Sequence, residues 1–126
     1  MTDAQPIRGR LLGPDDAPPT GERAEDVAVV GSARVEQILS GALTGPVEYL
    51  QAHDEWVVVL AGCAELEVMG ERHELAAGEW VLLPAGTPHR LVRAQPGTAW
   101  LAVHGDDAGT APPAERATAR GRPPGP

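Results

Sequence analysis

The sequence predicts an all-β fold: one domain in which two sheets close into a jelly-roll barrel. Three observations support this prediction. The apolar segments are short, Gly and Pro turns separate them at near-regular spacing, and one segment alternates strictly between apolar and acidic residues. Such segments are typical of strands in sandwiches and barrels, and closing two sheets together removes most exposed strand edges. A length of 126 residues fits a single hydrophobic core.

The expected strands follow one another through the middle of the chain. In order, they cover residues 26–31, 33–40, 45–51, 55–60, 63–70, 72–75, 78–83, 89–93 and 98–104. Segment 63–70 has the clearest pattern, because Ala64, Leu66 and Val68 share one face of a strand. The pattern of segment 33–40 also fits a helical turn, so that alternative stays open.

Two of the expected strands are apolar on both faces. Trp56 and Trp80 open the apolar runs of these strands, and the residues that follow are apolar at every position. One face can point into the core, and the other needs cover from the N-terminal strands or from a second subunit. We therefore expect a homodimer. The residues expected to be largely buried are Val57, Val59, Leu66, Val81 and Leu83.

The domain is expected to span residues 26–104, between disordered tails at 1–25 and 105–126. The tails are rich in Pro, Gly, Ala and charged residues, and they cannot bury enough apolar surface to offset their ordering entropy. The chain starts without the basic and apolar regions of a signal peptide, and it contains no long apolar span. Its one cysteine, Cys63, cannot form an internal disulfide. These features predict a cytoplasmic location.

The net charge of −8 bears on the partners of this chain. Nucleic acids and anionic membranes repel a protein of this charge, so neither is expected as a partner. A small molecule, acting as ligand or substrate, is the partner that fits best.

The segment from Gly78 to His89 carries the strongest functional signal. An apolar strand is followed by a turn containing Pro84 and Gly86, and His89 opens the next strand. Upstream, Glu55 opens another apolar strand. A carboxylate and an imidazole at two strand starts can provide half of a metal site or of an acid/base site.

These two segments resemble the two sequence motifs of the cupin superfamily. The second motif consists of a glycine, five residues, Pro-x-Gly, two residues and a histidine, and segment 78–89 matches every specified position. The first motif reads His-x-His, a short gap, Glu, six residues and Gly, and its second half is matched by Glu55 and Gly62. With a gap of three residues, Tyr49 and Gln51 stand where its histidines are expected. The chain thus resembles small single-domain bacterial cupins that carry Tyr-x-Gln.

The resemblance implies a site at the centre of the barrel. Glu55 and His89 would be its catalytic residues and also ligands of a divalent transition metal such as Mn, Fe, Ni or Zn. Tyr49 and Gln51 share the strand parity of Glu55, so they can face inward and ligate the metal through oxygen. His104 is a further candidate ligand, if the last two strands pair beside each other. In a jelly roll, however, these strands usually belong to different sheets.

Three other residues are weaker candidates. His53 lies in the expected loop before Glu55, where it either completes the metal shell or is solvated. His73 follows a turn and is expected at the surface. Cys63 has no basic neighbour in sequence to lower its pKa, so we interpret it as inert.

Two classes of function stay open. The first is a metal-dependent enzyme of oxygenase, isomerase or lyase type, in which Glu55 and His89 do the chemistry. Without a metal, the same two residues could still act as an acid/base pair. The second class is a non-catalytic module that binds or senses a small ligand, and a degenerate structural cupin is a third option. The missing His-x-His favours the non-catalytic readings, whereas Glu55 and His89 favour the enzyme.

Overall fold

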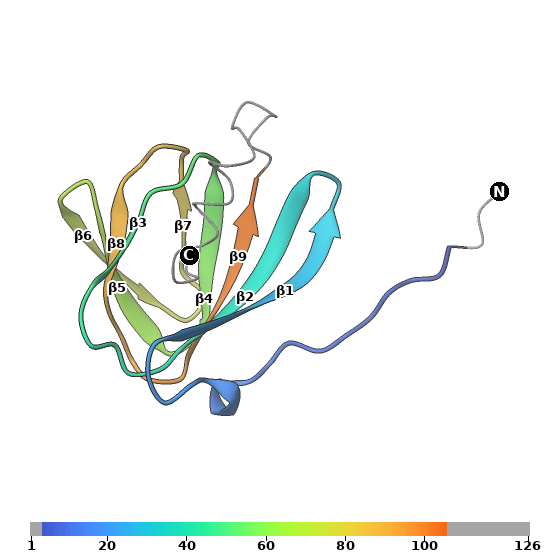
Figure 1. The fold of residues 1–126 in the computed structure, drawn as a ribbon, viewed down its shortest axis with the longest axis horizontal. Coiled ribbons are helices and arrows are strands. Elements are labelled where there is room, and N and C mark those ends of the chain that lie inside the picture. Colours follow the sequence, from blue (N-terminus) through green and yellow to red (C-terminus); the bar gives the residue numbers. More distant parts are fainter. Residues whose placement is uncertain (1–3, 106–126) are drawn as a thin grey trace.

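The computed structural model describes residues 4–105, which form two antiparallel sheets facing each other in a jelly-roll barrel (Figure 1). The five-stranded sheet has the order β1-β2-β9-β4-β7, and the four-stranded sheet has the order β3-β8-β5-β6. The strands are β1 (Glu22–Val30), β2 (Ala33–Ser40), β3 (Val47–Tyr49), β4 (Glu55–Ala61), β5 (Cys63–Val68), β6 (Glu71–Ala76), β7 (Trp80–Leu83), β8 (His89–Ala94) and β9 (Thr98–His104). A short 3-10 helix, η1 (Pro14–Asp16), precedes them. The predicted all-β jelly roll is confirmed.

The strand predictions agree closely with these elements. Segment 33–40 is the strand β2, so its helical alternative is wrong. Consecutive strands β8 and β9 lie in different sheets, as a jelly roll requires. Within residues 4–105, no helix is long and apolar enough to span a membrane.

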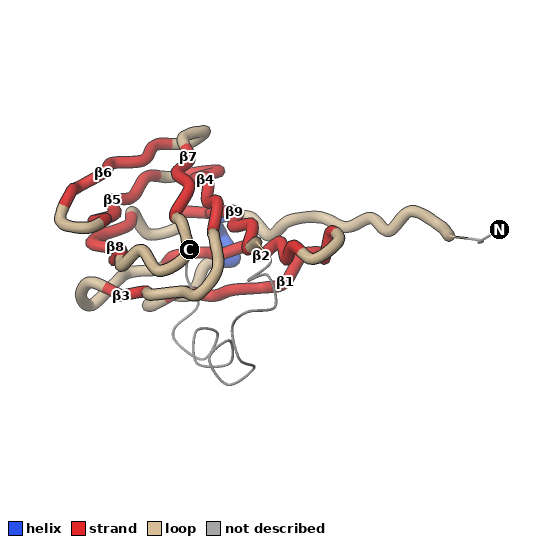
Figure 2. Tube along the Cα trace, turned by 90° about the horizontal axis from the view of Figure 1, so that it is seen from above, coloured by secondary structure: helices blue, strands red, loops and turns tan. Residues whose placement is uncertain are grey.

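The N-terminal boundary of the domain needs a correction. Strand β1 begins at Glu22 rather than at residue 26, because β1 pairs with β2 along its whole length and Glu22 lies opposite Ser40. Backbone pairing, rather than apolar side chains, therefore extends the sheet into the expected tail. Residues 4–10 lead away from the sheets (Figures 1 and 2). Residues 1–3 and 106–126 of the expected tails lie outside the described part of the chain.

The core lies between the two sheets. Of the five residues expected to be buried, Val57, Val59, Leu66 and Leu83 are at most 2% exposed, together with Trp100 from β9. Val81 is only half-buried, contrary to the prediction. Val81 lies near the start of the edge strand β7, which has a neighbour on one side only, whereas Leu83 at the end of the same strand is buried.

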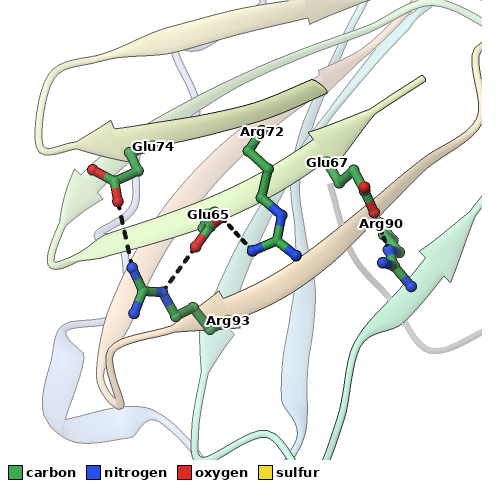
Figure 3. A network of polar contacts seen from close by, with 6 residues as sticks. All are labelled: Glu65, Glu67, Arg72, Glu74, Arg90 and Arg93. Carbon is green, nitrogen blue, oxygen red and sulfur yellow. Dashed lines mark hydrogen bonds and ion pairs between the residues drawn. The ribbon is translucent and has the colours of Figure 1, made fainter. Parts of the chain in front are cut away.

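The outer face of the four-stranded sheet is covered by ion pairs (Figure 3). Glu65 on β5 lies at its centre, 2.8 Å from the guanidinium of Arg72 and 3.0 Å from that of Arg93. The hydrogen bond from Arg72, reinforced by the charge of Arg93, lowers the pKa of the Glu65 carboxyl. The whole network consists of Glu65, Glu67, Arg72, Glu74, Arg90 and Arg93. Such a face is suited to contact with water.

The outer face of the five-stranded sheet has the opposite character. Trp80 and Leu82 on β7 are 58% and 53% exposed, and Leu60 on β4 is 41% exposed. The indole of Trp80 lies against that of Trp56, with ring centroids 5.9 Å apart. A contiguous apolar patch of this kind on a small domain typically marks a contact surface.

We expect this patch to pair two copies of the chain, because pairing would remove both tryptophans from water. Light scattering at micromolar concentration should give about twice the chain mass of 13.1 kDa. The change Trp80→Arg should give the monomer mass, because it places a charge in the centre of the contact. Met69→Arg changes another exposed apolar residue, in the turn between β5 and β6 of the other sheet, and serves as the control. A wild-type mass of 13.1 kDa would contradict the homodimer.

Candidate functional site

An unusual number of polar side chains is buried between the sheets. Each is at most 9% exposed: Glu36, Ser40, Gln51, Glu55, His89 and His104. Strand register brings together those of the five-stranded sheet, since β9 lies between β2 and β4 and places their inward residues in adjacent rows. Burying charged groups costs free energy, so their concentration in so small a core indicates a site rather than a scaffold.

Glu55 and His89 form the centre of this cluster. Glu55 is the first residue of β4 and is fully buried, and His89 is the first residue of β8. The His89 Nε2 lies 4.0 Å from the Glu55 Oε1. The His89 Nδ1 lies 3.1 Å from the carbonyl oxygen of Thr87, which can only accept a hydrogen bond. Nδ1 therefore carries a proton, and Nε2 is the ring nitrogen that faces the carboxylate.

Tyr49 and Gln51 are both buried, on the side of the barrel formed by β3 and the loop that follows it. Tyr49 lies opposite His89 in the pairing of β3 with β8, and their rings stack with centroids 5.5 Å apart. The Tyr49 hydroxyl donates to the carboxyl of Glu22 at 2.7 Å. The main-chain oxygen of Gln51 accepts a hydrogen bond from Gly86, which fixes the turn before His89.

Sequence reasoning missed Glu22, which was assigned to the tail. Its second carboxyl oxygen accepts a hydrogen bond from the Ser40 hydroxyl at 2.8 Å, and the Trp100 indole donates to Ser40 at 3.0 Å. Burial raises the pKa of Glu22, although the hydrogen bonds from Tyr49 and Ser40 act in the opposite direction. The charged run around Glu22 looks like a solvated segment, so it contains no signal for this role.

The buried His104 and the half-buried His53 form a second group beside the first. His104 lies opposite Glu55 in the β4–β9 pairing. Its Nδ1 is 2.9 Å from the Nε2 of His53, and its Nε2 is 2.9 Å from the carboxylate of Glu36. Arg34 pairs with the other oxygen of Glu36 at 3.2 Å. Both ring nitrogens of His104 are thus engaged away from His89, and His53 contacts His104 from its loop.

The structure brings together too few ligating side chains for the predicted metal centre. Glu55 and His89 face each other, whereas the Tyr49 hydroxyl donates to Glu22 and the His104 nitrogens contact His53 and Glu36. Among residues 4–105, no group of three or more His, Cys, Asp or Glu side chains is arranged to hold a metal ion. Catalytic metals usually take three protein ligands, so the residues present do not fit such a centre.

The remaining candidates lie at the surface. His73 is partly exposed beside Glu71, with 3.6 Å between its Nε2 and the carboxylate. Cys63 is exposed. Neither contacts the buried cluster through any interaction that the structure describes, which agrees with their interpretation as surface and inert residues.

One described pocket, of about 520 Å³, opens beside His89. Its lining includes Glu48, Leu50 and Arg90, which alternate along their strands with inward-facing residues. His89 also borders this pocket, but its side chain is only 2% exposed and points to the opposite face of the sheet. The pocket thus borders the site at Tyr49 and His89, and Glu55 is not among its lining residues.

Comparison with known proteins agrees with this fold. Residues 34–104 match a family model described as a cupin domain. The protein SchB of Streptomyces halstedii is 30% identical over 100 residues, which cover 72% of this chain and 70% of that protein.

Solved structures of similar fold include proteins of several kinds. A crystal structure from Ralstonia eutropha JMP134, provisionally named as a mannose-6-phosphate isomerase, is 32% identical with a TM-score of 0.66, covering 80% of this chain and 99% of that one. A mutant of the oxalate decarboxylase OxdC of Bacillus subtilis is 17% identical with a TM-score of 0.60, covering 86% of this chain and 32% of that one. At this identity, the second likeness concerns the fold alone.

Proposed function

The chain belongs to the cupin family, and we propose that it binds a small uncharged hydroxy-carbonyl compound between Glu55 and His89 and transfers protons on it. The observation that carries the proposal is the distance of 4.0 Å between the two side chains. This is too long for a direct hydrogen bond. An oxygen atom of a ligand fits the gap if it lies about 2.8 Å from both the His89 Nε2 and the Glu55 Oε1, with an angle of about 90° at that oxygen.

The chemistry that suits this geometry is isomerisation through an enediol. In the proton-transfer step, the Glu55 carboxylate takes the proton from the carbon next to the carbonyl. The imidazolium form of His89 donates its Nε2 proton to the carbonyl oxygen, while Nδ1 stays bonded to Thr87. Glu55 then returns its proton to the former carbonyl carbon, and the hydroxyl on the carbon that was first deprotonated gives its proton to His89, which yields the isomer and regenerates both groups.

The charges inside the barrel support an uncharged substrate. Glu22, Glu36 and Glu55 all point into the interior, whereas the guanidinium of Arg34 is already paired with Glu36 and with Asp26. A phosphate group would meet carboxylates without a spare cation. The Ralstonia eutropha relative, provisionally named as an isomerase, therefore supports the reaction class rather than a phosphorylated substrate.

Cupins often bind metal ions, and a metal-dependent reaction is the variant of this proposal that metal analysis tests. Because no group of three or more His, Cys, Asp or Glu side chains among residues 4–105 is arranged to hold a metal ion, no step above depends on a metal. We expect purified protein to keep its activity after chelation. Loss of activity on chelation, restored by added Mn²⁺ or Zn²⁺, would replace the metal-free reaction by a metal-assisted one.

A second candidate function is binding without turnover. The observation that favours it is the engagement of His104 with His53 and Glu36, which leaves the pair at the centre with few catalytic neighbours. A ligand would then occupy the same place and undergo no reaction.

The test is proton exchange in deuterium oxide. Wild-type protein is incubated with glycolaldehyde, dihydroxyacetone and glyceraldehyde, and proton NMR follows the loss of the signals from carbons next to the carbonyl. We expect exchange faster than in buffer for at least one compound. Shifts of the His89 ring signals without exchange would favour the binding module, and neither shifts nor exchange would contradict the proposal.

A further inference from the structure

We infer that Glu22 is a positioning residue for the Glu55–His89 pair, because it holds the tyrosine on which the His89 ring is stacked. The inference deepens the proposed function, and only its expected effect on turnover rests on that function. The arrangement of the side chains can be tested separately.

The first step is the connection between the two sheets. Glu22 is the first residue of β1 in one sheet, and Tyr49 is the last residue of β3 in the other. One carboxyl oxygen of Glu22 accepts the Tyr49 hydroxyl at 2.7 Å, and the other accepts the Ser40 hydroxyl at 2.8 Å. Since Ser40 also receives the indole proton of Trp100, the Glu22 carboxyl is held from both sides.

The second step leads from Tyr49 to His89. The two rings stack at 5.5 Å with an angle of 23° between their planes. On the imidazole, Nδ1 is fixed by the carbonyl of Thr87, so the ring is restrained at one edge and on one face. Together these contacts direct Nε2 toward Glu55. A displaced Tyr49 ring would let the imidazole turn, and misplacement by about 1 Å can lower a rate by about 100-fold.

The alternative is that Glu22 merely ties the sheets together. A glutamine would accept the same hydrogen bond from Tyr49 without bringing a carboxyl into the interior. Burial raises the pKa of Glu22, which means that the ionised side chain makes the folded state less stable at neutral pH than a neutral side chain of the same shape would. The geometry of the Tyr49–His89 stack favours a role in the site, and the His89 ring signals separate this role from that of a tie between the sheets.

The experiment uses the fact that Tyr49 is the only tyrosine of the chain. Protein labelled with carbon-13 at the tyrosine Cζ gives one signal, and nitrogen-15 labelling of histidine reports the His89 ring. In Glu22→Leu, we expect both signals to move and the turnover number in the exchange assay to fall about tenfold or more, with KM near the wild-type value. Glu22→Gln should restore the signals and most of the turnover, because its amide oxygen accepts the Tyr49 hydroxyl.

Two further variants complete the test. Glu25→Leu makes the same change at an exposed position of β1 and should match the wild type. Tyr49→Phe keeps the ring but removes the anchored hydroxyl, so it should move the His89 signals and lower turnover even if Glu22→Leu fails to fold. Unmoved His89 signals in both Glu22→Leu and Tyr49→Phe would overturn the inference. So would moved signals with unchanged turnover.

The failure of the proposed function would look different. If the wild type exchanges none of the test compounds, the positions of the Tyr49 and His89 signals in the Glu22 variants still decide whether Glu22 positions the pair. Moved signals would then support the positioning, while the missing exchange would count against the proton-transfer chemistry alone.

Discussion

Glu55→Gln is expected to lower the rate of carbon-bound proton exchange by about 100- to 10,000-fold, which is the usual contribution of a general base. The reason is chemical, since the amide cannot accept a proton and yet has nearly the shape of the carboxylate. The fully buried position should tolerate this change, because no charge remains in the core afterwards. The measurement is single-compound exchange in deuterium oxide, with circular dichroism to show that the variant is folded.

Comparison with other variants separates chemistry from general damage. His89→Gln should lose activity to a similar extent, and the double variant should lose little more, because two residues that act as one unit are not additive. Glu74→Gln makes the same change on the exposed outer face, where its side chain is 78% exposed, and should keep wild-type exchange. Full activity in Glu55→Gln would rule out this residue as the base and leave binding without turnover as the better account.

Much of the fold could be predicted because its signals are local. Each strand carries its own period and its own turn residues, so the bounds of β2, β4 and β9 follow from segments of fewer than ten residues. The pair Glu55 and His89 could be found for the same reason, since each stands at a fixed place relative to a turn or strand start. The parity of Tyr49 and Gln51 likewise predicts that both are buried, as they are.

The rest of the site depends on register between distant strands. Glu36 and His104 are 68 residues apart in sequence, and their contact follows from the pairing of β2 with β9. Glu22 reaches Tyr49 across the space between the sheets, 27 residues away. No period within one strand contains this information. The lack of this information in the sequence also explains why His104 is predicted as a metal ligand, although its ring contacts His53 and Glu36 instead.

Gly62→Ala is expected to lower the free energy of unfolding by about 3 kcal/mol, because it combines an unfavourable backbone conformation with a steric clash. Gly62 has a φ of +88°, and a Cβ there would lie 2.5 Å from the Thr98 Oγ1 and 2.9 Å from the Thr98 Cα. Thr98 cannot easily move, since it is fully buried and its hydroxyl accepts a hydrogen bond from the backbone of Cys63. Urea denaturation measures the difference.

Gly78→Ala provides a matched control, because Gly78 has almost the same φ of +89° and nothing lies within 4 Å of its Cβ position. Its free energy of unfolding should fall only by the cost of the backbone conformation, about 1 to 2 kcal/mol. Both glycines belong to the motifs that identify the family, yet the structure assigns them different tasks. Gly78 lets the chain turn into β7, whereas Gly62 also lets β4 pass close to β9 as the chain leaves one sheet for the other. Equal losses of stability in the two variants would show that the close approach to Thr98 is relieved at little cost.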